Sequence, residues 1–393
     1  MRICFWATTF QADNQALACH LAAQEGFEVL VVLDDPDRYR AQPVERILPF
    51  KGELADRRKK LRSWLRLVKF DPDVLIVDNK LPPYYLLYRP EKLFVLWHGY
   101  GWRVDHPAGM RRDMSRLVGD VTRPNHRFRW QAFGEPDAEF TAGHRQIDAG
   151  SIHTLGAAYS DVLRPGSELR ARFEPKDFAD GYPGLDIVNR PTVLIGMTWH
   201  HGGLLGHWGE EWELLGQLLD HLDERGANVI LRMHDRMRYD PEYVLEMTRF
   251  CEQRSGVLLK FKSESPDSLV DVLVSDAMVT NYSSFANTFY YMEKPCVHIV
   301  PPEAGEGLAM SQWSKRGVSK VAVDKRDAFW KVPPEDVGGL RATSFEALLT
   351  AVDQTLDEPD CCVELARGYL SRHIESPNGE TCQRIQELLE TWR

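Results

Sequence analysis

The sequence predicts an α/β protein of two doubly wound domains, each built on a parallel sheet. Short apolar runs alternate with helical patterns along the whole chain, which is typical of parallel strands joined by right-handed helical crossovers. The length of 393 residues suits two hydrophobic cores better than one. Dense proline and glycine between 164 and 191 interrupt the alternation and separate two halves.

The apolar runs place strands and the periodic stretches place helices. In the first half we expect the strands Ile3–Ala7, Glu28–Leu33, Asp73–Val77 and Leu93–Trp97, with helices near 13–25, 54–69 and 135–145. In the second half we expect the strands Thr192–Met197, Asn228–Met233, Val257–Phe261, Ala277–Thr280 and Cys296–Val300, with helices near 210–225, 241–254, 266–273, 284–293 and 343–357. The domains are then 1–165 and 192–365, joined by 166–191. A helical segment, 366–393, follows and could cross back to the first domain. Such domains imply a cleft, with ligands at the carboxyl ends of the strands.

Composition argues against several functional classes. The net charge of −10 is unfavourable for a nucleic-acid-binding protein, which needs a basic footprint. No apolar run approaches the roughly 20 residues that span a bilayer. The first residues do not form a signal peptide, so we expect a cytoplasmic protein. The seven cysteines are scattered without zinc-ligand spacing, as in proteins with reduced thiols.

One segment is strongly basic, although the chain as a whole is acidic. Seven of the thirteen residues from 57 to 69 are lysine or arginine. In a helix, Leu61, Trp64, Leu65 and Val68 would share one face. That stripe either packs on the domain's own sheet, or contacts an anionic membrane surface or an anionic polymer together with the cations.

The stretch Val279–Phe285 is predicted to be a strand-to-helix turn that binds phosphate. A buried strand ends near Thr280, and Asn281, Ser283 and Ser284 precede a new helical pattern. Serine and asparagine cap helices because their side chains accept unpaired backbone N–H groups of the first turn. The same N–H groups bind anions. The alternative is an ordinary cap without a ligand.

His98 is expected at the mouth of a cleft. It follows the apolar run Leu93–Trp97 and precedes Gly99, which permits a tight turn and close ligand approach. Imidazole titrates close to neutral pH and therefore suits proton transfer. The alternative is a strand-end histidine whose ring is satisfied by the backbone.

His234 ends a second strand in the same way. It lies between Arg232 and Arg236, and guanidinium groups of this kind neutralise a diphosphate. Asp235 could orient His234 or pair with an arginine. A surface charge cluster is the alternative.

The first strand of the second domain also leads into a loop that we expect to face the cleft. That loop carries Thr198, Trp199, His200 and His201 before two glycines. We do not expect a metal ion there. Adjacent histidines point in different directions, and no carboxylate or cysteine neighbour has ligand spacing.

Together these motifs resemble the CDP-glycerol glycerophosphotransferases of teichoic-acid synthesis, a family with the GT-B fold. The resemblance covers most of the chain through dispersed segments. They are Trp97-His98-Gly99, Gly156–Asp161, Thr198-Trp199, Leu231–His234, Thr280–Ser284, Glu293-Lys294-Pro295 and Asn378-Gly379-Glu380. Ala158, His200, Asp235 and Asn281 depart from the residues usual in that family, as in a divergent member.

The resemblance implies two GT-B domains, with the acceptor bound by the first and the nucleotide donor by the second. An alditol-phosphate unit would pass from a CDP-activated donor to a hydroxyl of a glycan or lipid-linked acceptor, without a metal or other cofactor. His98 resembles the general base, and His234 the histidine that contacts the donor diphosphate. Ser283 and Ser284 resemble the phosphate cradle.

Three other interpretations stay open. A GT-B glycosyltransferase that uses a nucleotide sugar would have nearly the same site. A nucleotide-sugar 2-epimerase would share the architecture but needs carboxylates that move a carbon-bound proton, and we identify none in the sequence. A non-catalytic binding protein with a decayed site would also keep the fold.

Overall fold

The computed structural model describes residues 1–393 except 8, 41–42, 79–80, 82–89, 98, 103–107, 197–204, 235–236, 238, 263, 301–308, 315–316, 323–329, 378 and 393. The chain forms two compact units. The N-terminal unit comprises Met1–Tyr100, Asp105–Arg172 and Leu370–Arg393. The C-terminal unit comprises Gly101–Val104 and Phe173–Tyr369.

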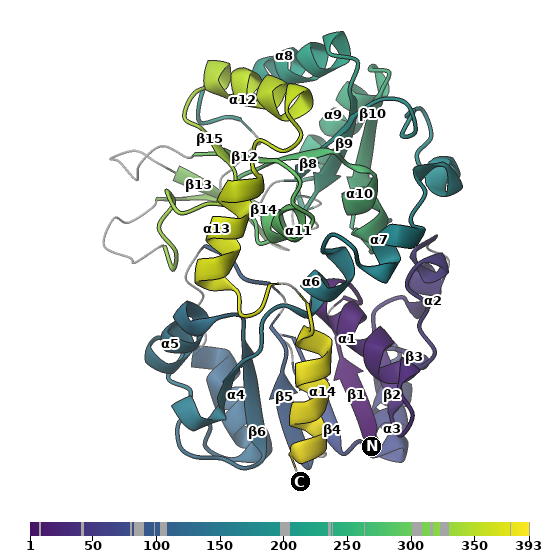
Figure 1. Cartoon of the computed structure of the whole chain (residues 1–393), viewed down its shortest axis with the longest axis vertical. Helices are drawn as coiled ribbons and strands as arrows, with labels where there is room; N and C mark the ends of the chain where they lie inside the picture. The colour runs from purple at the N-terminus through teal and green to yellow at the C-terminus, as the bar shows by residue number, and fades with distance from the viewer. Residues whose placement is uncertain are drawn as a thin grey trace. The chain divides into compact units, whose positions relative to one another are not determined.

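The N-terminal unit is built on a seven-stranded parallel sheet with the order β3-β2-β1-β4-β5-β6-β7. Its strands are β1 (Arg2–Trp6), β2 (Glu28–Leu33), β3 (Glu53–Asp56), β4 (Val74–Val77), β5 (Lys92–Val95), β6 (Phe128–Ala132) and β7 (Ile152–Thr154). Its helices are α1 (Ala12–Ala23), α2 (Pro36–Arg40), α3 (Lys60–Phe70), α4 (Ala108–Val118), α5 (Glu135–Gly143), α6 (Ala158–Leu163), α7 (Glu168–Arg172) and α14 (Thr381–Thr391), with the 3-10 turns η1 (Pro43–Arg46) and η2 (Ala149–Ser151). Figure 1 labels most of these elements.

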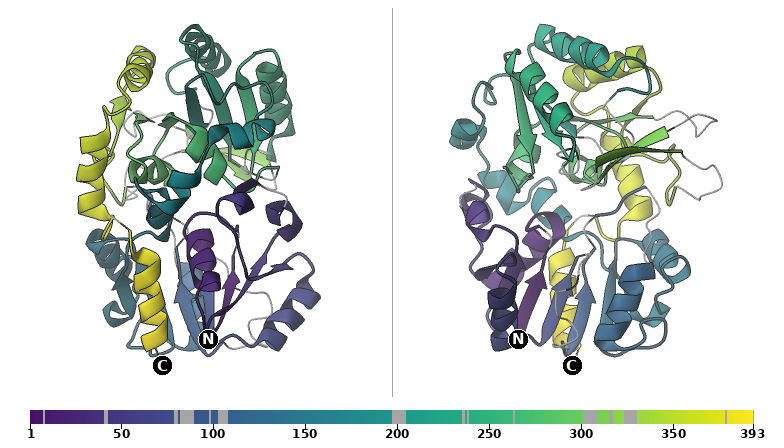
Figure 2. Two further views of the ribbon diagram at one scale, coloured as in Figure 1. Left: turned by 45° about the vertical axis from the view of Figure 1, so that its right-hand side comes forward. Right: turned by 180° about the vertical axis from the view of Figure 1, so that it is seen from behind.

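The last helix completes this unit although it comes from the end of the chain. α14 packs against α1 and α6, as the left view of Figure 2 shows. Asp161 of α6 accepts hydrogen bonds from the backbone N–H groups of Thr381 (3.1 Å) and Cys382 (2.7 Å). A carboxylate at this position satisfies the unpaired amides at the start of α14 and favours the helix dipole.

The C-terminal unit contains a six-stranded parallel sheet with the order β10-β9-β8-β11-β12-β15. Its strands are β8 (Thr192–Gly196), β9 (Asn228–Met233), β10 (Val257–Phe261), β11 (Ala277–Thr280), β12 (Cys296–Ile299) and β15 (Leu340–Ala342), and β13 (Ala309–Ser314) pairs antiparallel with β14 (Gly317–Ala322). Its helices are α8 (Glu211–Glu224), α9 (Pro241–Glu252), α10 (Leu269–Val274), α11 (Ala286–Tyr291) and α12 (Phe345–Asp357), with the 3-10 turn η3 (Pro175–Gly181). The boundary between the units falls within α13 (Val363–His373).

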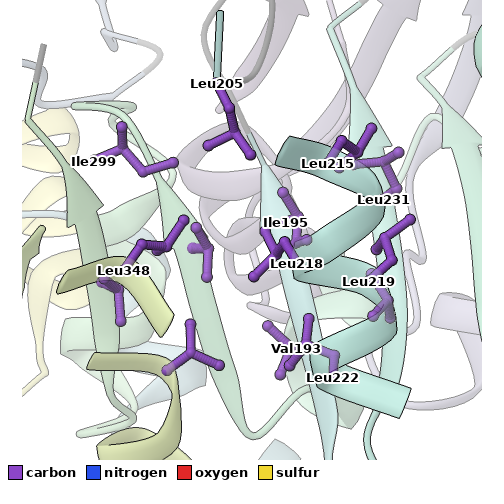
Figure 3. Close-up of a cluster of buried hydrophobic side chains, with 14 of the residues drawn as sticks. Val193, Ile195, Leu205, Leu215, Leu218, Leu219, Leu222, Leu231, Ile299 and Leu348 are labelled. Carbon is purple, nitrogen blue, oxygen red and sulfur yellow. The ribbon is translucent and has the colours of Figure 1, made fainter. Parts of the chain in front are cut away.

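Helix α8 shows how the second core forms. Leu215, Leu218, Leu219 and Leu222 recur at helical spacing and are almost fully buried. Figure 3 shows these leucines beside Val193 and Ile195 of β8. Because helices cover parallel sheets, such strands are apolar on both faces, and all five residues of β8 are indeed buried.

The predicted α/β fold class, with two doubly wound parallel sheets, is confirmed. The predicted helix 54–69 is wrong in its first turn, because residues 53–56 form β3 and pair with β2 at the edge of the sheet. The sequence did not predict the strands β3, β6, β7, β13, β14 and β15. No helix in the described ranges is both long and apolar enough to cross a bilayer.

Candidate nucleotide-binding site

The site is best located by the order of the strands in the C-terminal unit. Numbered along the chain, the sheet has the order 3-2-1-4-5-6, so the winding direction reverses between β8 and β11. In sheets of this type, ligands bind beyond the carboxyl ends of the strands at the point of reversal. β8 ends there at Gly196 and β11 ends there at Thr280. The predicted phosphate turn is the segment that leaves β11 at this point.

The turn is anchored to the sheet at its start. Thr280 is fully buried, and its hydroxyl donates a hydrogen bond to the carbonyl oxygen of Gly196 on the neighbouring strand. Tyr282 has a φ of 54°, a left-handed conformation that is uncommon for a bulky residue. Its hydroxyl donates to the carbonyl oxygen of Pro334 at 2.8 Å, and only 1% of the residue is exposed. The sharp reversal is therefore held by specific contacts on both sides of Asn281.

The two serines follow this reversal and are half-buried. Ser283 begins the helical turn: its carbonyl accepts from the N–H of Ala286 at 2.9 Å, and its hydroxyl accepts from the N–H of Phe285 at 3.3 Å. The predicted strand-to-helix turn is thus present, but the predicted serine cap is not: the N-cap of α11 is Phe285, without a side-chain cap, and the hydroxyl of Ser283 bonds within the turn that precedes the helix. Because α11 has only six residues, fewer than two turns, an anion at this turn would depend mainly on the local N–H and hydroxyl groups.

An aromatic cluster packs against the turn through the ring of Tyr282. The ring of Tyr282 contacts Trp102, Trp330 and His298, with ring centroids 6.0, 4.9 and 5.6 Å away. Trp102 is fully buried, and its indole N–H donates to the carbonyl of Asp336 at 2.8 Å. Burial lowers the pKa of His298 to about 3, so this histidine is neutral at any physiological pH. Sequence reasoning missed this cluster because its members are far apart in the chain.

Gly101 lies against the serine turn. A methyl group placed on Gly101 would be 3.8 Å from the Cβ of Ser284. Gly101 and Trp102 both belong to the C-terminal unit, and Trp102 accepts backbone hydrogen bonds from Lys331 and Val332. Gly101 is therefore held beside Ser284 within this unit.

His234 leaves the same edge of the sheet. Arg232 of β9 pairs with Gly196 of β8, and Val279 of β11 pairs with Ile195 of β8. Arg232 and Thr280 therefore lie at the same height across the sheet, and His234 and Tyr282 each lie two residues beyond them toward the carboxyl ends of the strands. Two strand spacings separate β9 from β11, about 10 Å. His234 is exposed, and its carbonyl accepts from the N–H of Met237 at 2.9 Å.

Arg232 has other partners. Its guanidinium binds the carboxylate of Asp271 and donates to the carbonyl of Ser265 at 2.7 Å. Asp271 also accepts from Lys260 (2.7 Å) and from the hydroxyl of Tyr182 (2.6 Å). Burial by itself would raise the pKa of Asp271, but the adjacent charges of Arg232 and Lys260 lower it below its ordinary value. Arg232 thus belongs to a buried ion cluster.

Several predicted site residues lie outside the described residues: His98, Thr198, Trp199, His200 and Arg236. Gly99 is described and has a φ of 145°, a conformation that favours glycine and agrees with the predicted tight turn. Where the structure is described, histidine, cysteine, aspartate and glutamate nowhere gather in groups of three that could hold a metal ion.

Two parallel, doubly wound sheets of this kind define the GT-B fold class, to which the chain belongs by its fold. Solved structures with this fold include the wall teichoic acid polymerase TagF. One TagF structure, soaked with CDPG, is 15% identical with a TM-score of 0.67 and covers 99% of this chain and 88% of its own. The UDP-GlcNAc 2-epimerase from Neisseria meningitidis bound to UDP-GlcNAc is 13% identical with a TM-score of 0.59, and 99% of each chain is covered. S. aureus MnaA with UDP is 12% identical with a TM-score of 0.57, over 100% of this chain and 97% of that one. The sequence matches no family model, and a comparison with curated proteins finds no relative. At these identities the likenesses establish the fold.

Proposed function

We propose that the protein is a transferase that moves a glycerophosphate or similar alditol-phosphate unit from a CDP-activated donor to a hydroxyl of a glycan or lipid-linked acceptor. The observation that carries the proposal is the position of the serine turn. It lies where the strand order reverses, which is where sheets of this type bind the phosphates of nucleotides. Its motif and the fold of TagF agree with this assignment.

On the donor side, the hydroxyl and backbone N–H groups of Ser283 and Ser284 hold the diphosphate. His234, about two strand spacings away on the same edge, contacts the diphosphate from the other side and stabilises the leaving group. Arg236 and Thr198 complete this set. Arg232 is left out because its guanidinium is bonded to Asp271 and Ser265.

On the acceptor side, His98 is the general base. Gly101 lies against Ser284, and His98 precedes Gly101 by three residues in the sequence. In this proposal the imidazole acts on a donor that is bound at the serine turn. Gly99, with its positive φ, lets the backbone turn between the two residues.

In the transfer step, an acceptor hydroxyl oxygen forms a bond to the phosphorus that carries the alditol. The bond from that phosphorus to the bridging oxygen breaks on the opposite side, and CMP leaves. His98 takes the hydroxyl proton, and the groups at the serine turn and His234 receive the charge that develops on the leaving phosphate. Such a reaction depends mainly on positioning and charge stabilisation.

A donor screen tests the proposal. We expect CDP-glycerol or CDP-ribitol to raise the melting temperature most among CDP-glycerol, CDP-ribitol, UDP, UDP-GlcNAc and GDP. A ligand at a hundred times its Kd stabilises the folded state by about 2.7 kcal/mol. Mass spectrometry of the reaction should then identify CMP as the nucleotide product. Stabilisation by a uridine or guanosine nucleotide alone would overturn the choice of donor.

Matched variants test the division of roles. Ser284→Ala should weaken donor binding on the order of tenfold, because it removes a hydrogen bond to a charged group. Ser255→Ala is the control, since Ser255 lies exposed just before β10 at the opposite edge of the sheet. His98→Ala should abolish transfer and leave donor binding nearly unchanged. An equal loss of donor binding in His98→Ala would contradict its role as a base.

A nucleotide-sugar 2-epimerase is the second candidate, because the epimerase structures share the fold over nearly the full length of both chains. The same screen separates the two. An epimerase would be stabilised by UDP-GlcNAc and would exchange the C2 proton of the sugar with solvent deuterium, whereas the proposed transferase would do neither.

A further inference from the structure

The outer face of α3 is apolar and uncovered in the N-terminal unit. α3 packs on β3 and buries Ser63 and Leu67. Leu61, Leu65 and Val68 are 64%, 52% and 39% exposed. These three residues follow the spacing i, i+4, i+7 and form one line along the helix. The expectation that this stripe packs on the domain's own sheet is therefore wrong for these three side chains.

Cations surround this line. Lys60, Arg62 and Lys69 are exposed, and they form no ion pair with any carboxylate that the structure describes. No acidic residue occurs from 57 to 69. On a helix, Arg62 and Lys69 lie about 80 to 100° around from Leu61, so they border the apolar line on one side. An apolar stripe beside a row of cations characterises helices that lie in the plane of a membrane interface.

A pocket adjoins the cationic side of α3. It has a volume of about 360 Å³ and lies among α2, β3 and α3, which Figure 1 shows next to one another. Its charged lining consists of four cations and two carboxylates: Arg40, Lys59, Arg62, Arg66, Asp37 and Asp56. Two of these cations are paired, Arg66 with Glu53 of β3 and Lys59 with Asp56 at 4.0 Å. The remaining positive charge, which includes Arg62, suits an anion of the size of a lipid headgroup phosphate.

We propose that α3 and the adjoining pocket form a docking surface for an anionic lipid bilayer. Leu61, Leu65 and Val68 enter the boundary between headgroups and acyl chains, and the phosphate of an anionic lipid binds in the pocket beside Arg62. Charge complementarity selects this partner. A second copy of the chain would bring the same cations face to face, and their repulsion opposes such a dimer. Binding to the bilayer requires no catalytic activity and is independent of the proposed function.

Vesicle sedimentation with the full chain tests the proposal. We expect binding to vesicles of phosphatidylcholine mixed with phosphatidylglycerol, and little binding to phosphatidylcholine alone. Added salt should weaken the binding, because ions screen the attraction between the cations and the surface. Equal binding to both kinds of vesicle, or none to either, overturns the proposal.

Substitutions on α3 test the apolar line. Leu61→Gln and Leu65→Gln should each weaken vesicle binding about fivefold, because a half-exposed leucine has roughly half of its transfer free energy to gain. Leu245→Gln on α9 is the control, since Leu245 is 51% exposed on a helix of the other unit. Both leucines lie in water in the structure, so the melting temperature should not change. Unchanged vesicle binding by the variant that carries both Leu61→Gln and Leu65→Gln overturns the proposal.

Two cations on the same helix test the pocket. Arg62 lines it and Lys69 does not. Removing one positive charge near an anionic surface costs about a fivefold loss of binding, which sets the expectation for Lys69→Gln. Arg62→Gln should lose several times more, and Arg123→Gln, at a cation 82% exposed elsewhere in the unit, should lose less than either. Equal losses for Arg62→Gln and Lys69→Gln contradict binding in the pocket.

Concentration-dependent light scattering that disappears in Leu61→Gln would assign the surface to a dimer and overturn the proposal.

Discussion

Asp13 is a buried carboxyl group in the first turn of α1, and replacing it with asparagine should stabilise the N-terminal unit. Asp13 is 5% exposed, and its Oδ1 accepts a hydrogen bond from the N–H of Tyr159 at 3.0 Å. Burial raises its pKa from 3.8 to about 7, and the nearby charge of Asp161 adds to this although hydrogen bonds from the backbone oppose it. Asparagine keeps the accepting oxygen and removes the charge.

The sign and size follow from proton linkage. Between pH 3.8 and about 7 the folded state binds the proton at Asp13 and the unfolded state has lost it. The contribution of Asp13 to stability is therefore fully present below the lower value and is lost as the pH rises through the upper one. One pKa unit is 1.36 kcal/mol, so the loss from pH 5 to pH 8 is about 2 to 3 kcal/mol. Asp13→Asn should lack this loss.

Urea titrations at pH 5 and pH 8, read by hydrogen exchange in α1 and α6, report on this unit separately from the other. Asp37→Asn is the control, because Asp37 is exposed on α2 of the same unit. The control should keep the pH dependence of the parent protein. If Asp13→Asn also kept it, or if it were the less stable protein at pH 8, the assignment of a buried, protonated carboxyl would be refuted.

Three further perturbations follow from the structure. The parent protein should lose about 2 kcal/mol of unfolding free energy between pH 8 and pH 5, because His298, with a pKa of about 3, stays neutral in the folded state while the unfolded state takes up a proton below pH 6.5. His298→Gln should remove this loss; hydrogen exchange in β12 measures it, and an unchanged pH dependence contradicts the prediction. Asp271→Asn should cost the C-terminal unit about 3 to 5 kcal/mol, because Arg232 and Lys260 lose their buried counter-ion; a loss below about 1 kcal/mol in urea titrations would disprove a charged cluster. Asp161→Ala should cost about 1 to 2 kcal/mol and speed proteolysis within α14, because two amides lose their acceptor; equal proteolysis rates would count against the cap.

The fold class could be predicted because buried parallel strands are apolar on both faces. The bounds of β2, β9, β10 and β11 agree with the predicted strands residue for residue. β3 could not be predicted in this way. Residues 53–56 contain one large apolar side chain, Leu54, and pair only with β2 at the edge of the sheet. Their strand conformation depends on a neighbour 23 residues earlier in the chain, which local periodicity does not reveal.

Only the local part of the candidate site could be predicted, because contacts between residues far apart in the sequence leave no local pattern. The serine turn is local, so the residues from Thr280 to Phe285 predict it by themselves. The partner of Arg232 is 39 residues away, and a charge count could not distinguish a phosphate from the carboxylate of Asp271. The support under the turn comes from Trp102, whose indole reaches Tyr282 across 180 residues of sequence. Such contacts depend on topology, which the pattern of one sequence leaves open.

The membership of residues 370–393 in the N-terminal unit has a consequence for biosynthesis. A ribosome makes all of the C-terminal unit after residue 172 before it makes α14, so the nascent N-terminal unit first lacks the helix that packs on α1 and α6. During that interval Asp161 has no amides of α14 to bind, and the apolar side chains Ile385 and Leu389, which are fully buried in the finished protein, have not yet covered their neighbours. The first unit to be translated is thus the last to be completed, and an early folding intermediate of this chain should expose the surface beside α1 that chaperones recognise.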